Sequence, residues 1–246
     1  MKTEIIALHG FLGQPEDWKE VFAEIKSQHP DWDVVAVDWI REPTLGPQQN
    51  FENWSKNFCN WVSARPAVQR RTLVGYSLGG RLALHALERQ PELWQAAVFL
   101  SVNPGLQSAQ EKLQRLQADK DWALRFHKED FFQVLSDWNK QSVFMGSAEP
   151  DRSTLSVFQN EWAQCLENWS LGWQKDFRVS MDFWQVRQIW VAGQKDTKFC
   201  ELLKTIPLIP ELQKWEIQEA SHRLLFEAPV EVAHFIQRAS LGLVHQ

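Results

Sequence analysis

The sequence Gly75-Tyr76-Ser77-Leu78-Gly79 places a serine between two glycines. An apolar run ends at this serine, and the helical pattern RLALHAL follows it. A strand that turns sharply into a helix holds a serine hydroxyl clear of the sheet, and small residues two positions to either side keep strand and helix from colliding. The positive end of the helix then lies near that hydroxyl. This context predicts that Ser77 is a nucleophile. The alternative is a glycine-rich turn with a serine helix cap.

A serine nucleophile needs a base, and the base needs a carboxylate to orient it. In this architecture the acid and then the histidine follow the serine along the chain. Asp196 and His222 each follow a strand-like run, and ligands bind at the carboxyl ends of strands in open α/β sheets. We therefore predict Ser77, Asp196 and His222 as the catalytic residues. Asp38 also ends a strand-like run and is the alternative acid, while helix capping is the alternative role for Asp196.

The remaining six histidines are weaker candidates for the base. His9 is the only rival, but it precedes the serine in the chain. The others lie in helical or tail contexts that suit a packing or surface role, namely His29, His85, His127, His234 and His245.

The segment LHGFLG, residues 8–13, comes directly after the first strand-like run. A His-Gly turn at this place brings backbone N–H groups near the serine. We predict an oxyanion hole made by the amides of Phe11 and Leu78, in which loss of one donor typically costs ~10²–10³ in rate. An ordinary glycine turn is the alternative.

Arg81 lies four residues after Ser77, hence on the same face of the predicted helix. A cation in a buried site is costly unless an anion pairs with it. Arg81 is therefore either a solvated helix arginine or a clamp for a substrate carboxylate.

Short apolar runs alternate with helical patterns along the rest of the chain. Continuous apolar runs are typical of parallel strands buried on both faces, and their alternation with helices predicts an open, mostly parallel α/β sheet flanked by helices. The expected strands are 3–10, 32–39, 71–77, 96–102, 188–193 and 214–220. The expected helices are 17–27, 51–64, 78–89, 197–204 and 229–241, the last beginning at Pro229.

Residues 105–187 interrupt this alternation, because they contain helical patterns and no strand-like run. Six of the 14 tryptophans fall here: Trp122, Trp138, Trp162, Trp169, Trp173 and Trp184. We predict a helical cap, 105–187, inserted into a core formed by 1–104 and 188–246.

Composition excludes several classes of function. The net charge is −5 and no block of five Lys or Arg occurs, which disfavours nucleic-acid binding. The three cysteines, Cys59, Cys165 and Cys200, form no CxxC pair, so reduced thiols in a cytoplasmic protein are expected rather than disulfides or a zinc site. No signal-type or membrane-spanning segment is found. We expect no metal and no cofactor, and the sequence does not indicate an oligomeric state.

Several motifs together resemble those of the α/β-hydrolase superfamily. More narrowly, the chain is similar to the 2-succinyl-6-hydroxy-2,4-cyclohexadiene-1-carboxylate (SHCHC) synthase family of menaquinone biosynthesis. The resemblance covers most of the chain, and the cap motifs are more specific than the serine turn. The motifs are LHGFLG, LVGYSLGGR, PGLQSAQEKLQRLQADKDWALRF, DWNKQSVF, AGQKDTKF and ASH.

This resemblance implies an α/β-hydrolase fold and a lyase. In the family, an activated serine–histidine pair removes a proton, and pyruvate is eliminated from the polycarboxylate cyclohexene SEPHCHC to give SHCHC. The resemblance further implies that Arg81 and Arg115 clamp carboxylates of a small anionic substrate and that Tyr76 and Trp138 line the pocket. A carboxylic ester hydrolase using an acyl-enzyme is the alternative activity, and a non-catalytic binding protein is a third.

The chain departs from the family pattern at two places. The family's third cap arginine falls, without gaps, on Gln159, although Arg152 could substitute in a shifted register. The loop DWIREPTLG, 38–46, replaces the family's D-x-P-G-H-G-x-S turn at the rim of the site. Both changes concern which substrate binds more than how catalysis proceeds.

Overall fold

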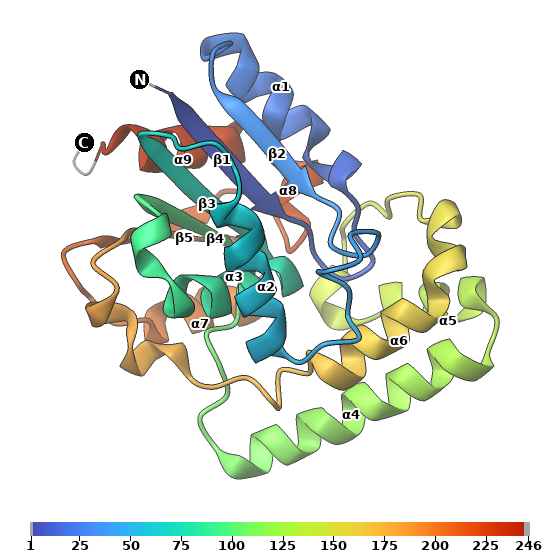
Figure 1. The fold of residues 1–246 in the computed structure, drawn as a ribbon. Coiled ribbons are helices and arrows are strands. Elements are labelled where there is room, and N and C mark those ends of the chain that lie inside the picture. The colour runs from blue at the N-terminus through green and yellow to red at the C-terminus, as the bar shows by residue number, and fades with distance from the viewer. Residues whose placement is uncertain (1, 244–246) are drawn as a thin grey trace.

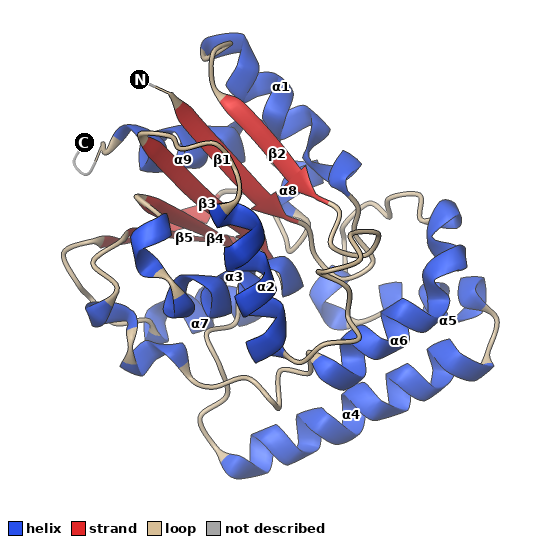
Figure 2. Cartoon of the chain, viewed as in Figure 1, coloured by secondary structure: helices blue, strands red, loops and turns tan. Residues whose placement is uncertain are grey.

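The computed structural model describes residues 2–243, and its centre is one six-stranded sheet (Figures 1 and 2). All neighbouring strands in this sheet are parallel, in the order β2-β1-β3-β4-β5-β6. The predicted fold class, a parallel sheet flanked by helices with a helical insertion, is confirmed. The strands are β1 (Thr3–Leu8), β2 (Asp33–Val37), β3 (Arg70–Tyr76), β4 (Ala96–Leu100), β5 (Arg187–Gly193) and β6 (Leu212–Ile217).

Helices cover both faces of the sheet (Figure 1). One face packs on α1 (Lys19–Gln28), α8 (Leu224–Glu227) and α9 (Pro229–Leu241). The other packs on α2 (Phe51–Ser63), α3 (Leu78–Arg89) and α7 (Thr197–Thr205). Because both faces are covered, β3, β4 and β5 are buried almost throughout, as predicted from their continuous apolar runs, and β1 is buried as well. The same prediction is wrong for β2, which is only partly buried because it lies at the edge of the sheet.

The insertion between β4 and β5 is helical. It contains α4 (Ala109–Lys128), α5 (Phe131–Asn139) and α6 (Gln159–Asn168), which lie beside the end of the sheet toward which the strand arrows point (Figures 1 and 2). Ser108 and Glu111 form a capping box at the start of α4, and the Asp130 side chain caps α5. Short 3-10 turns complete the chain: Pro15–Trp18, Pro91–Leu93, Ser142–Phe144, Ser153–Phe158, Phe177–Val179 and Met181–Phe183.

Two expected boundaries differ from the structure for local reasons. β2 ends at Val37 rather than 39, because Asp38 begins a turn in which its side chain accepts from the amide of Arg41. The helix expected over 17–27 begins as a 3-10 turn with Pro15 in its first turn, and α1 proper starts at Lys19. Within residues 2–243, no helix has both the length and the apolar character needed to cross a membrane.

Candidate active site

Ser77 stands at a sharp junction between β3 and α3. Its backbone angles, φ 51° and ψ −112°, are strained for a residue with a side chain. Neighbouring backbone lies too close to Gly75 and Gly79 for either to carry a side chain. A Cβ at Gly75 would lie 2.4 Å from the Cα of Gly80, and a Cβ at Gly79 would lie 2.3 Å from the carbonyl oxygens of Leu8 and His9. The strand and helix therefore meet without side chains between them, which leaves the serine projecting from the turn.

The structure brings Ser77, His222 and Asp196 into one hydrogen-bonded series. The Nε2 atom of His222 lies 3.2 Å from the Ser77 hydroxyl oxygen, and its Nδ1 lies 2.7 Å from Oδ2 of Asp196. A proton on Nδ1 would be donated to this carboxylate, which leaves Nε2 free to accept from the serine. Asp196 also begins α7, where its other oxygen accepts from the amide of Phe199. Capping and orienting the imidazole are thus compatible.

The rival acid and base lie elsewhere. Asp38 pairs with Arg41, with 2.7 Å between carboxylate and guanidinium. His9 is buried and stacked on Trp39, and burial lowers its pKa to about 4, so the ring is neutral at neutral pH. His85 stacks on Phe51. His245 lies outside the described residues.

A cavity of about 130 Å³, partly open to solvent, lies in front of Ser77. Phe11 and Leu78 line it. Leu78 is the first residue of α3, so its N–H has no partner within the helix. Neither the Phe11 amide nor the Leu78 amide donates to any acceptor within residues 2–243. Two residues that line the cavity thus have backbone N–H groups without an acceptor among the described residues, which is compatible with the predicted oxyanion hole.

Two arginines line the same cavity, and they differ in whether a carboxylate of the protein pairs with them. Arg81 donates to the carbonyl oxygen of Trp169 at 2.8 Å but has no carboxylate partner in the described part of the chain. Its pKa is lowered by burial and by the positive charge of Arg115. Arg115 is paired, because its Nε lies 2.8 Å from both carboxylate oxygens of Asp119. Arg81 is therefore the cation with more to gain from an anionic ligand.

The two predicted pocket aromatics occupy different positions. Trp138 lines the Ser77 cavity and packs on Phe11, with 4.6 Å between ring centroids. Tyr76 lines an adjoining space of about 40 Å³ together with Arg152 and Arg223. Trp138 lines both spaces and, with Phe11, forms part of the wall between them.

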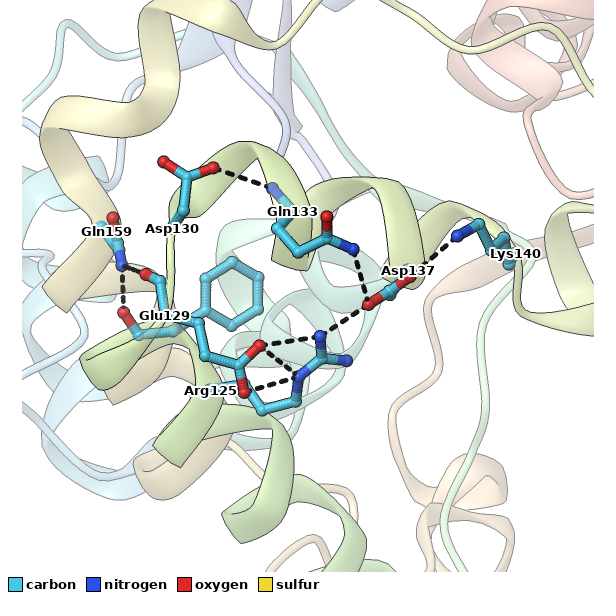
Figure 3. Close-up of polar contacts among 8 residues, drawn as sticks. Arg125, Glu129, Asp130, Gln133, Asp137, Lys140 and Gln159 are labelled. Carbon is cyan, nitrogen blue, oxygen red and sulfur yellow. Dashed lines mark hydrogen bonds and ion pairs between the residues drawn. The ribbon is translucent and has the colours of Figure 1, made fainter.

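Gln159 and Arg152 both lie away from the Ser77 cavity. The Gln159 amide nitrogen donates to the carbonyl oxygens of Phe126 and Glu129 and so caps the end of α4 (Figure 3). Arg152 forms a buried, bidentate ion pair with Asp17, at 2.6 and 2.8 Å. Neither side chain provides a third cap cation at this cavity.

The sequence reasoning missed five polar residues that line the cavity: Ser101, Asn103, Asp119, Gln141 and Lys198. Asn103 follows the carboxyl end of β4, so the rule that ligands bind at strand ends could have identified it. Lys198 follows Asp196 by two residues, within a motif in which only the aspartate was selected. Within residues 2–243, no group of three or more His, Cys, Asp or Glu side chains is arranged to hold a metal ion.

Comparison with known proteins shows which families and folds this chain is similar to. The family described as "alpha/beta hydrolase fold" matches residues 4–229. SHCHC synthase of Serratia proteamaculans is 32% identical over 211 residues, which cover 81% of this chain and 80% of that protein. The structure of MenH from S. aureus superposes with a TM-score of 0.80 at 20% identity, covering 96% of this chain and 92% of the other. A thermophilic esterase from Thermogutta terrifontis superposes with a TM-score of 0.71 at 18% identity, covering 99% and 91%.

Proposed function

The chain belongs to the α/β hydrolase fold family, and on that premise we propose that it is a lyase of the SHCHC synthase type. It would eliminate pyruvate from SEPHCHC to form SHCHC in menaquinone biosynthesis. Ser77, His222 and Asp196 are the proposed catalytic residues. The proposal rests mainly on their hydrogen-bonded series, which opens into a cavity that Arg81 lines without a carboxylate partner.

The proposed reaction begins with proton removal. His222 accepts the Ser77 proton through Nε2, and the serine oxygen takes a proton from the substrate ring. The electron pair left by that C–H bond forms a ring double bond as the C–O bond to the enolpyruvyl group breaks. The leaving enolpyruvate accepts the proton carried by the His222 imidazolium and becomes pyruvate, which restores neutral His222 and consumes no water. The Asp196 carboxylate stabilises the imidazolium that forms meanwhile.

Charge stabilisation is the second contribution of the site. The unpaired amides of Phe11 and Leu78 can donate to an oxygen that becomes negative during proton removal. Arg81 can hold a substrate carboxylate, because no carboxylate within residues 2–243 forms an ion pair with it.

Pyruvate release from SEPHCHC tests the proposal directly. Wild-type protein is expected to release pyruvate, which is measured with a coupled lactate dehydrogenase assay. In Ser77→Ala, kcat/KM for SEPHCHC is expected to fall at least about 10³-fold. Circular dichroism of the variant should match the wild type, since removing one hydroxyl leaves the turn intact. Turnover of SEPHCHC by the variant at a wild-type rate would refute the serine's role.

Ester hydrolysis is the second candidate, favoured by the shared fold of an esterase and by the amides of Phe11 and Leu78, which have no acceptor within residues 2–243. Short p-nitrophenyl esters supplied to the same preparation distinguish the two activities. Rapid ester turnover without pyruvate release would select the hydrolase, and the reverse result would select the lyase.

A further inference from the structure

Lys198 belongs to the wall of the Ser77 cavity. It lies in the first turn of α7, two residues after Asp196. The next residue, Phe199, packs its ring 4.7 Å from that of His222. Lys198 is itself exposed, which puts it at the open side of the cavity rather than at its floor. A group bound there would lie close to the proposed catalytic histidine.

The charges around the cavity do not balance. Three cationic side chains line it, Arg81, Arg115 and Lys198, against the single carboxylate of Asp119. Arg115 and the hydroxyl of Ser170 both bind that carboxylate. The excess positive charge of this wall therefore favours a ligand that carries more than one negative charge.

Lys198 has no protein partner that would account for its position. It forms no hydrogen bond or ion pair with any residue among 2–243, and its ammonium lies 5.9 Å from the centre of the Phe199 ring. The first turn of a helix is also an unfavourable place for a cation, because the N-terminus carries partial positive charge. Partial desolvation by the surrounding protein, followed by the charge of Arg115, lowers the pKa of Lys198, although the residue as a whole remains exposed. Folding alone does not explain this lysine.

We infer that Lys198 binds a carboxylate of the substrate at the open side of the cavity, while Arg81 and Arg115 hold another deeper inside. The inference rests on the proposed function for the identity of the ligand as a polycarboxylate. It makes Lys198 a determinant of specificity, which favours ligands with two separated carboxylates over ligands with one.

Kinetics of the charge-removing and charge-keeping variants test this role. Lys198→Gln should raise KM for SEPHCHC about tenfold and leave kcat nearly unchanged, because the lost contact is equally strong in the ground and transition states. Lys198→Arg should restore KM to near the wild-type value. Lys195→Gln is the matched control: Lys195 lies three residues earlier, in the turn just before α7, pairs with Glu219 at 2.8 Å and does not line the cavity. It should leave both constants unchanged.

Binding to Ser77→Ala gives a readout that does not depend on turnover. The probes are 2-succinylbenzoate, with two carboxylates, and 3-benzoylpropionate, which lacks the ring carboxylate, titrated by calorimetry. The diacid should bind about tenfold more tightly than the monoacid, and adding Lys198→Gln should remove this preference.

The two readouts separate the inference from the proposed function. If wild-type protein releases no pyruvate but its preference for the diacid still depends on Lys198, the lyase proposal fails and the carboxylate site remains. Unchanged KM and unchanged preference in Lys198→Gln would overturn the inference. So would equal loss of binding for both probes with a lowered melting temperature, since that result indicates a structural role.

Discussion

Arg81 illustrates, at the level of one residue, a position where binding and stability have opposing requirements. Its guanidinium is half-buried and has one carbonyl partner, Trp169, but no carboxylate within residues 2–243. Desolvating a charge without a counter-ion is unfavourable. The arrangement is explained if a substrate anion completes the pair, which is the role proposed here.

We therefore expect Arg81→Met to affect activity far more than folding. The free energy of unfolding should change by less than about 1 kcal/mol, because the lost carbonyl bond is offset by relief from desolvation. The value of kcat/KM for the anionic substrate should fall at least about tenfold. Urea unfolding and steady-state kinetics measure the two quantities, with Arg81→Lys as the charge-keeping control. If the free energy of unfolding fell by more than about 2 kcal/mol, twice the expected change, Arg81 would instead serve mainly to stabilise the fold.

His9 should make the stability of the protein depend on pH. Burial lowers its pKa from 6.5 to about 4, so between these values the unfolded chain binds more protons at this position than the folded chain. Stability from His9 is therefore complete above pH 6.5 and is lost as pH falls toward 4, with a slope of up to about 1.4 kcal/mol per pH unit.

Urea unfolding at pH 7, 6 and 5 measures this slope. His9→Gln has no titrating ring, so its stability should decline less steeply than that of the wild type, whatever its stability at pH 7. The comparison cancels the other titrating groups, including His85, whose pKa burial also lowers. Parallel pH profiles for the two proteins would show that His9 does not titrate as described.

At the level of elements, one buried ion pair fastens the cap to the loop that bears the proposed oxyanion amide. Arg152 precedes the 3-10 turn Ser153–Phe158, and Asp17 lies in the turn directly after the segment 8–13. Both side chains are less than 10% exposed. The Asp17 carboxylate also accepts from the amide of Gln14, so the pair holds that turn as well as the cap.

Breaking this pair on one side should be costly, since it leaves a buried charge uncompensated. Arg152→Leu should lower the free energy of unfolding by about 3–5 kcal/mol, and so should Asp17→Leu, whereas the double variant should recover much of the loss. A double-mutant cycle in urea measures the coupling. Strictly additive losses would mean that the two residues act independently.

The same elements indicate what the sequence could and could not predict. Alternating strand-like and helical patterns predicted the parallel strands, and positions at strand ends selected Ser77, Asp196 and His222, whose side chains lie together in the structure. Both rules use only local sequence. The contact between Arg152 and Asp17 joins residues 135 positions apart. It depends on the path of the irregular segment 140–158, which has no periodicity to interpret. The capping role of Gln159 depends likewise on where α4 ends relative to α6 (Figure 3).

At the scale of the whole molecule, the cap and the sheet share one apolar core. Buried cap residues such as Phe126, Trp162 and Trp169 belong to the same cluster as Trp39 and Trp54 of the core. The rings of Trp39 and Trp162 meet edge to face at 5.9 Å, and those of Trp39 and Trp169 at 5.3 Å. The predicted division into a core and a cap at 105–187 therefore describes the path of the chain, and we propose that the two parts do not unfold separately.

Hydrogen exchange tests this cooperativity. Opening the cap alone would expose the buried tryptophans of α6 and its following turn together with Trp39, at a cost that grows with the apolar area exposed. The slowest amides of α6 should therefore exchange with the same free energy as those of β3, and both should match the global value from urea unfolding. Amides of α6 that exchange several kcal/mol more easily than those of β3 would instead show that the cap opens as an independent unit. Substrate entry would then be governed by that opening, rather than by passage through the side of the cavity where Lys198 lies.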